Sequence, residues 1–267
     1  MELFEHVFNK TTIYESFFFS IKSVLEYPDI RMLKEEKPEL FKQWELIAKA
    51  KYQFTGYEYD EDAYMMMLND IYTSKAVFFP EFSKIVAITY ATLESSDGEL
   101  IRHFKKIVNK DEFEVIKTFQ KVLLQISSDG VKSTPQYFPT LCGHNIINND
   151  IPLFIKRLFH HRDKFEEKID LLPFIIKKYL QAKPWDANIV DTMNLWKFNG
   201  ISNTPLSTIS DFTNLKRNTE MLQMDELSKY YWDNIEDKED ETLEYIALQS
   251  ANQTNLVIQI MNEIRSL

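Results

Sequence analysis

An apolar run from Lys84 to Leu93 (KIVAITYATL) commits this chain to a β-sheet, because it is rich in β-branched residues and ends at turn residues. The turn Ser95-Ser96-Asp97-Gly98 follows and leads into a second extended stretch, Glu99 to Val108. An Asp-Gly pair between two such stretches is typical of a β-hairpin. The sequence therefore predicts a central strand with a hairpin partner.

Hydrophobic periodicity predicts the remaining elements. Further strands are expected at about 15–25, 137–142 and 188–195. Helices are expected at about 31–51, 60–73, 111–126, 150–159, 165–182, 205–213, 224–234 and 239–265. This order predicts an α/β fold, a mixed sheet with helices on both faces. Residues 1–267 are predicted to form one domain, with about 31–75 as a helical insertion after the first strand.

The composition favours a folded protein with a large core, since 44% of the residues are hydrophobic. A single cysteine, Cys142, excludes disulfides and cysteine-based zinc sites and fits a reducing compartment. The first residues lack the features of a signal peptide, and no run approaches the roughly 18 apolar residues of a membrane helix. We therefore expect a cytoplasmic protein with no membrane association.

The charge pattern argues against a protein that grips long stretches of nucleic acid. The net charge is −10, whereas a protein that neutralises many phosphates usually has a basic surface. The basic clusters at Lys105-Lys106 and 157–164 are interpreted as solvated helix faces. With only 5 Gly, the chain also has no glycine-rich phosphate loop, and it has no G-x-S-x-G or H-E-x-x-H motif.

The segment Gly143-His144-Asn145-Ile146-Ile147-Asn148-Asn149-Asp150-Ile151-Pro152 carries the strongest chemical signal. It places Asp150 at the start of a helix and beside the end of a strand, where open α/β sheets bind their ligands. The alternative is that the Asp150 side chain only caps its helix. This segment alone does not decide between the two interpretations.

Three segments together resemble one family. They are the segment just described, Phe82-Ser83-Lys84-Ile85-Val86, and the stretch Lys183-Pro184-Trp185-Asp186 with 189–198. In order and spacing they are similar to the predicted 3′–5′ exonucleases of the DEDDy type, which are related to the proofreading domain of family-B DNA polymerases. The resemblance runs from about residue 17 to 264. It implies a ribonuclease-H-like sheet.

The resemblance also implies a two-metal active site. In this family four carboxylates hold two divalent ions, Mg²⁺ or Mn²⁺, for phosphodiester hydrolysis. The first strand supplies an Asp and a Glu two residues apart, and the segment equivalent to that of Asp150 supplies a second Asp. The last helix supplies a Tyr and, four residues later, an Asp.

This sequence departs from the family at three of the four carboxylate positions. Matching Ile21 and Val24 to the first motif puts Ser20 and Lys22 at the positions of the Asp and the Glu. On the last helix, Tyr245 matches the tyrosine, but Gln249 stands four residues later. Asp150 remains as the one matching metal ligand. One carboxylate cannot hold two divalent ions, and the Lys22 ammonium could pair with Asp150 in place of a metal.

The sequence therefore predicts a pseudoenzyme, with a metal-free and catalytically silent pocket that binds no cofactor. The candidate substrate-binding residues are His144, Asn145 and Asp191, each of which could instead fix a turn or a strand end. Trp185 and Trp196 could stack on bases, although packing is the favoured interpretation. Single-stranded nucleic acid or a protein is the expected partner. An active exonuclease with a non-standard set of metal ligands and a pure interaction protein are the alternatives.

Overall fold

The computed structural model describes residues 13–52, 60–97, 99–128, 139–166, 189–197, 200–201, 203–217 and 220–266. A five-stranded mixed sheet forms its centre, in the order β3-β2-β1-β4-β5. The strands are β1 (Ser16–Leu25), β2 (Ser83–Ser96), β3 (Glu99–Val108), β4 (Thr140–Gly143) and β5 (Ile189–Asp191). β2 is antiparallel to β1 and to β3, and β4 is parallel to β1 and to β5. The predicted α/β class and the predicted hairpin are confirmed.

β1 lies in the middle of the sheet, and all ten of its residues are buried. The strand is covered on both faces of the sheet, and it buries four polar residues, Ser16, Ser20, Lys22 and Ser23, among its apolar ones. Phe17, Phe19 and Ile21 point to one face of the sheet. Ser20 and Lys22 alternate with them and belong to the opposite face.

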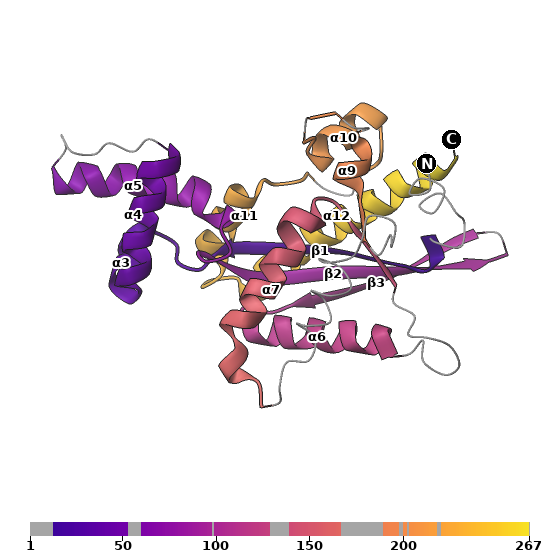
Figure 1. Ribbon diagram of the computed structural model, residues 1–267, viewed down its shortest axis with the longest axis horizontal. Coiled ribbons are helices and arrows are strands. Elements are labelled where there is room, and N and C mark those ends of the chain that lie inside the picture. The colour runs from indigo at the N-terminus through magenta and orange to yellow at the C-terminus, as the bar shows by residue number, and fades with distance from the viewer. Residues whose placement is uncertain are drawn as a thin grey trace.

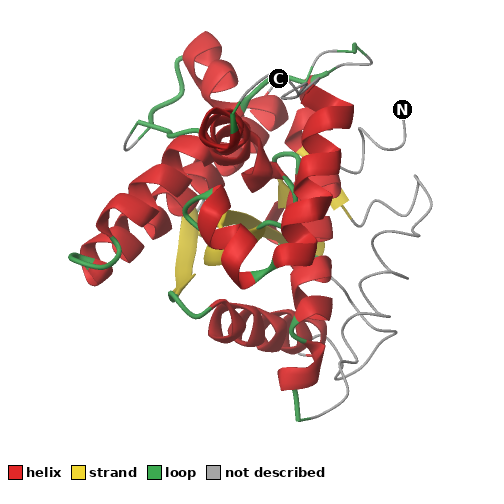
Figure 2. Cartoon of the chain, turned by 90° about the vertical axis from the view of Figure 1, so that its left-hand side faces the viewer, coloured by secondary structure: helices red, strands yellow, loops and turns green. Residues whose placement is uncertain are grey.

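Helices cover both faces of this sheet (Figures 1 and 2). The described helical segments are α3 (Ile30–Glu36), α4 (Pro38–Tyr52), α5 (Glu61–Lys75), η1 (Ala76–Phe78), α6 (Glu112–Ser128), η2 (Ile146–Asp150), α7 (Ile151–His160), η3 (Arg162–Lys164), α9 (Thr192–Trp196), α10 (Leu206–Thr213), α11 (Met224–Asn234) and α12 (Glu239–Ser266). α6 and α7 pack on the face of Phe17 and Phe19. α10, α11 and α12 pack on the opposite face.

The insertion between β1 and β2 consists of α3, α4, α5 and η1 and extends from one end of the sheet (Figure 1). Its own core is built around Trp44, which packs edge-on against Tyr72 and Phe82. Asp29 and Asp60 cap α3 and α5 by accepting backbone hydrogen bonds of 2.8 Å. The insertion core joins the sheet through Leu25 and Phe82, so it buries the point where β1 ends and β2 begins.

Some sequence predictions need correction, and others fall outside the described residues. The strand expected at 188–195 has only three strand residues, because the Asp191 side chain accepts a hydrogen bond from the Met193 backbone N–H and starts α9 instead. The helix expected at 165–182 lies mostly beyond the described ranges, and Trp185 lies wholly beyond them. None of the described helices is long and apolar enough to cross a membrane.

Candidate functional site

The candidate site lies where β1 runs on beyond the end of β4. The parallel pairing of these strands ends at Phe18, so the next stretch of β1 has an open edge on that side. The Asp150 carboxylate takes the place of a strand there, because its Oδ2 accepts a hydrogen bond of 3.0 Å from the Ile21 backbone N–H. Its Oδ1 accepts a hydrogen bond of 2.8 Å from the Asn149 side chain. The carboxylate forms no hydrogen bond with the start of α7, so the capping alternative is wrong.

A tight backbone path brings Asp150 to this edge. At Gly143 an added Cβ would lie 2.3 Å from Ile146 Cγ2 and 2.9 Å from the Phe19 carbonyl oxygen, so glycine is required. Asn145 follows in the left-handed region, with φ of 61°, which Asn tolerates better than most residues. The π-helical turn η2 then carries the chain to Asp150.

Asp191 and His144 hold this path in place. The Asp191 Oδ1 accepts a hydrogen bond of 2.7 Å from the Asn145 backbone N–H, and its Oδ2 accepts one of 3.2 Å from the Ile147 N–H. His144 lies within 3.0 Å of the Thr192 hydroxyl and 3.1 Å of the Thr204 carbonyl oxygen. These contacts fix the loop through the His144 ring, the Asn145 N–H and the Asp191 carboxylate. His144 and Asn145 also line the cavity described below.

Lys22 brings a positive charge to the same site. Its side chain is buried, and its Nζ donates a hydrogen bond of 2.6 Å to Gln253 Oε1 on α12. Burial lowers the pKa of Lys22 to about 8, although attraction to Asp150 opposes this change. Burial likewise raises the pKa of Asp150 to about 6, against its hydrogen bonds and the attraction of Lys22. At neutral pH the site therefore holds one ammonium and one carboxylate, which attract each other without a direct ion pair.

A cavity of about 310 Å³ opens beside these two groups. Its polar lining residues include Lys22, Asn149, Asp150 and Gln253. Its apolar lining residues include Phe78, Met193, Met221, Leu222 and Met224. Phe78 is 50% exposed although it is a large aromatic residue, and it comes from the last turn of the insertion. The site thus combines a fixed pair of charges with a wall suited to a flat apolar group.

Ser20 lies away from this cavity, in a buried cluster of hydroxyl groups. It donates a hydrogen bond of 2.8 Å to the Ser250 carbonyl oxygen, and its Oγ lies 2.9 Å from Ser250 Oγ. Thr254 donates a further hydrogen bond of 3.2 Å to Ser20 Oγ. The cluster binds β1 to α12, so Ser20 has its polar partners already.

The two residues predicted on the last helix are also placed outside the cavity lining. Tyr245 packs against the Tyr230 ring, with centroids 4.5 Å apart. Gln249 accepts a hydrogen bond of 3.2 Å from the Leu222 N–H and donates one of 2.8 Å to the Glu220 carbonyl oxygen. It thereby holds the segment that forms one wall of the cavity.

Sequence reasoning did not identify Gln253 or Phe78. Gln253 stands one helical turn beyond Gln249, so the four-residue spacing along α12 could have indicated that both share a face. No local sequence pattern indicates that Phe78 lines the cavity, because its position depends on how the insertion packs against the sheet.

The donor groups at this site do not fit a pair of divalent metal ions. Such ions need several hard anionic oxygen ligands, whereas Asp150 faces an ammonium and two amide groups. Within the described ranges, no three His, Cys, Asp or Glu side chains gather in a way that could hold a metal ion.

Comparisons with known proteins add no family to this description. No protein-family model matches the sequence, and neither a curated protein nor a solved structure matches it.

Proposed function

We propose that this protein is a catalytically silent relative of the DEDDy-type 3′–5′ exonucleases, which holds the end of a single-stranded nucleic acid without cutting it. The mixed five-stranded sheet with helices on both faces is compatible with a ribonuclease-H-like fold and supports the resemblance seen in the sequence. The position of Asp150 at the end of β4 supports it as well, since sites of this kind form at strand ends.

The observation that carries the proposal is the buried Lys22 ammonium beside Asp150. In the related nucleases a glutamate at this position would help to hold a metal ion. Here the ammonium supplies a positive charge directly, and it lies at the wall of a cavity where a phosphate oxygen could accept a hydrogen bond. Without an activated water, such a site binds a phosphodiester and leaves it intact.

The apolar residues that line the same cavity support recognition of a terminal base. Phe78 offers an exposed aromatic face, and aromatic stacking on a base contributes about 1–3 kcal/mol. Because the chain carries a net charge of −10, a long track of phosphate contacts is not expected. The proposed ligand is therefore a short 3′ end of one or a few nucleotides.

Binding of a short, 5′-labelled oligonucleotide measured by fluorescence anisotropy tests this proposal. We expect binding in the presence of EDTA, a shallow salt dependence corresponding to about one phosphate contact, and at least about tenfold weaker binding by Lys22→Met. The matched control is Lys229→Met, which removes an exposed lysine on α11. Equal binding by both variants, or no binding by the wild-type protein, would refute the proposal.

A nuclease assay with Mg²⁺ and Mn²⁺ separates the active alternative from the silent one. We expect the labelled oligonucleotide to stay intact with the wild-type protein. Metal-dependent shortening from the 3′ end that disappears in Asp150→Asn would instead establish an active exonuclease.

A further inference from the structure

A second, larger cavity lies apart from the candidate site. It has a volume of about 600 Å³ and lies between α7, the start of α4 and the Pro80-Glu81 turn before β2. None of the residues that line it lines the cavity beside Asp150. Its volume falls within the range of roughly 300–1,000 Å³ that is typical of small-molecule sites.

The walls of this cavity are largely apolar. The apolar residues in the lining are Leu40, Pro80, Ile155 and Phe159. Phe159 is 55% exposed, and the Arg162 guanidinium lies 4.6 Å from the centre of its ring. An exposed aromatic ring with a cation over one face offers a contact surface for an apolar group of a ligand.

The charges around the cavity favour an anion. Its cationic side chains are Lys37, Lys156, Arg157 and Arg162. They outnumber the two carboxylates that line the cavity, Glu26 and Glu81, by two, in a protein whose net charge is −10. Burial and the nearby Arg157 lower the pKa of His160, which therefore adds no charge at neutral pH.

Both carboxylates already have cationic partners. Glu81 lies 2.8 Å from Lys156, and Glu26 lies 3.0 Å from Arg157. Lys37 and Arg162 are therefore the two lining cations without a carboxylate partner in the lining. Lys37 forms no ion pair with any described residue, and the one ion pair of Arg162 within the described chain is with the exposed Asp163, 3.5 Å away.

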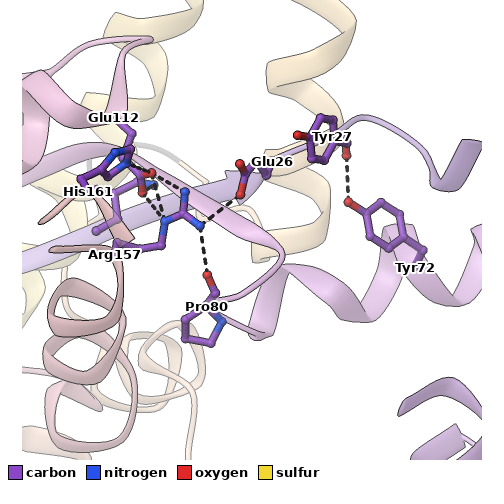
Figure 3. A network of polar contacts seen from close by, with 8 residues as sticks. Glu26, Tyr27, Tyr72, Pro80, Glu112, Arg157 and His161 are labelled. Carbon is purple, nitrogen blue, oxygen red and sulfur yellow. Dashed lines mark hydrogen bonds and ion pairs between the residues drawn. The ribbon is translucent and has the colours of Figure 1, made fainter. Parts of the chain in front are cut away.

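The floor of the cavity is rigid, because Arg157 is fixed on several sides (Figure 3). The Arg157 side chain is only 4% exposed, and its Nη1 donates hydrogen bonds to Glu26 and to the Pro80 carbonyl oxygen. Its Nε and Nη2 donate to Glu112, which also accepts hydrogen bonds from the Ile85 N–H. A floor that is fixed before binding reduces the entropy lost when a ligand enters.

We propose that this cavity binds a small organic anion, with an apolar body against Phe159 and Ile155 and an acidic head group held by Lys37 and Arg162. The size and the apolar walls favour a small ligand with an apolar part, and the excess of lining cations over lining carboxylates favours an anion over a neutral or cationic ligand. The proposal does not depend on nucleic-acid binding at Asp150.

Isothermal titration calorimetry with three eight-carbon probes tests the proposal. Octanoate, octanol and octylammonium each have eight carbons in a straight chain and differ in head-group charge. We expect saturable binding of octanoate and at least about tenfold weaker binding of the other two. Octyl phosphate distinguishes the head groups, since tighter binding than octanoate would assign a phosphate rather than a carboxylate. Absence of saturable binding, or equal binding of octanol, would overturn the proposal.

Charge-reversal variants locate the binding. The double variant Lys37→Glu with Arg162→Glu should bind octanoate at least about tenfold more weakly. Lys42→Glu with Lys121→Glu changes the net charge equally at exposed positions outside the cavity, and it should change affinity less than about twofold. Backbone amide signals of Ile155 and Phe159 should shift on titration. An equal loss in both double variants, or shifts centred elsewhere, would contradict the assignment.

Discussion

Lys22 and Asp150 are charged side chains that lie almost entirely out of water, with exposed fractions of 6% and 2%. Burial opposes the charged form of each, and their mutual attraction offsets part of this cost. The pKa of Asp150 rises from 3.8 to about 6, so the folded protein holds this proton more tightly than the unfolded chain. The stability contributed by protonated Asp150 is therefore complete below pH 3.8 and is lost as the pH rises to about 6.

Replacing Asp150 by Asn removes this pH dependence while an amide oxygen remains to accept the Ile21 N–H. A pKa change from 3.8 to about 6 corresponds to about 3 kcal/mol. Between pH 4 and pH 7, the free energy of unfolding of the wild-type protein should therefore fall by up to about 3 kcal/mol relative to Asp150→Asn. Urea unfolding at several pH values measures this difference. Asp237→Asn changes an exposed residue and is the control: its free energy of unfolding should depend on pH as that of the wild-type protein does. The same pH dependence in Asp150→Asn and the wild-type protein would contradict the prediction.

At the scale of single elements, the register of α12 determines which of its residues contacts Lys22. Gln253 reaches the ammonium, whereas Gln249 one turn earlier binds the segment at 220–222. Under the proposed relationship to the DEDDy-type exonucleases, matching Tyr245 to the family tyrosine puts the replaced carboxylate at Gln249, one helical turn before the residue that contacts Lys22. We therefore propose Gln253 as the equivalent position at this site.

Two double variants test this difference of one turn. Lys22→Glu with Gln253→Asp should bring three carboxylates together with Asp150 and create Mn²⁺ binding at least about tenfold tighter than in the wild-type protein. Lys22→Glu with Gln249→Asp should not, because its new carboxylate faces Leu222 and Glu220. Calorimetric titration with Mn²⁺ measures both, with circular dichroism to verify folding. Equal affinity in the two variants would refute the assignment to Gln253.

The contact of α7 with β1 and β2 depends on a buried ionic network (Figure 3). Burial would raise the pKa of Glu112, but its hydrogen bonds to His161 and Arg157 hold that pKa below the usual value. Arg157→Met leaves this carboxylate buried without its main partner, which should destabilise the protein by about 3–5 kcal/mol. Urea unfolding measures the loss.

A double variant and a surface control complete this test. Arg157→Met with Glu112→Gln should recover part of the stability, because the unpaired charge is gone. Lys156→Met breaks the more exposed ion pair with Glu81 and should cost no more than about 1 kcal/mol. Equal losses in the two single variants would show that burial of the network contributes little.

For the whole molecule, local sequence patterns predicted the elements better than their contacts. The hairpin and the helices flanking it follow from periodicity and turn residues, and they are observed. The length of β5 was wrong, because the cap that Asp191 provides for α9 overrides the apolar pattern. The cavity could be predicted only in part, since Lys22, Asp150 and Gln253 are far apart in the sequence and meet through the packing of β1, α7 and α12.

The arrangement of the sheet predicts where the molecule is hardest to open. β1 is central and fully buried, whereas β3 is an edge strand with mostly exposed residues. Amides of β1 should therefore exchange hydrogen only on global unfolding, whereas those of β3 exchange through local opening. We expect exchange in β1 to be at least about a hundredfold slower than in β3. Native-state hydrogen exchange at increasing urea concentration measures both strands, and the exchange free energy of β1 should fall with the slope of global unfolding. If β3 were protected as strongly as β1, the hairpin would belong to the same cooperative unit as the central strand.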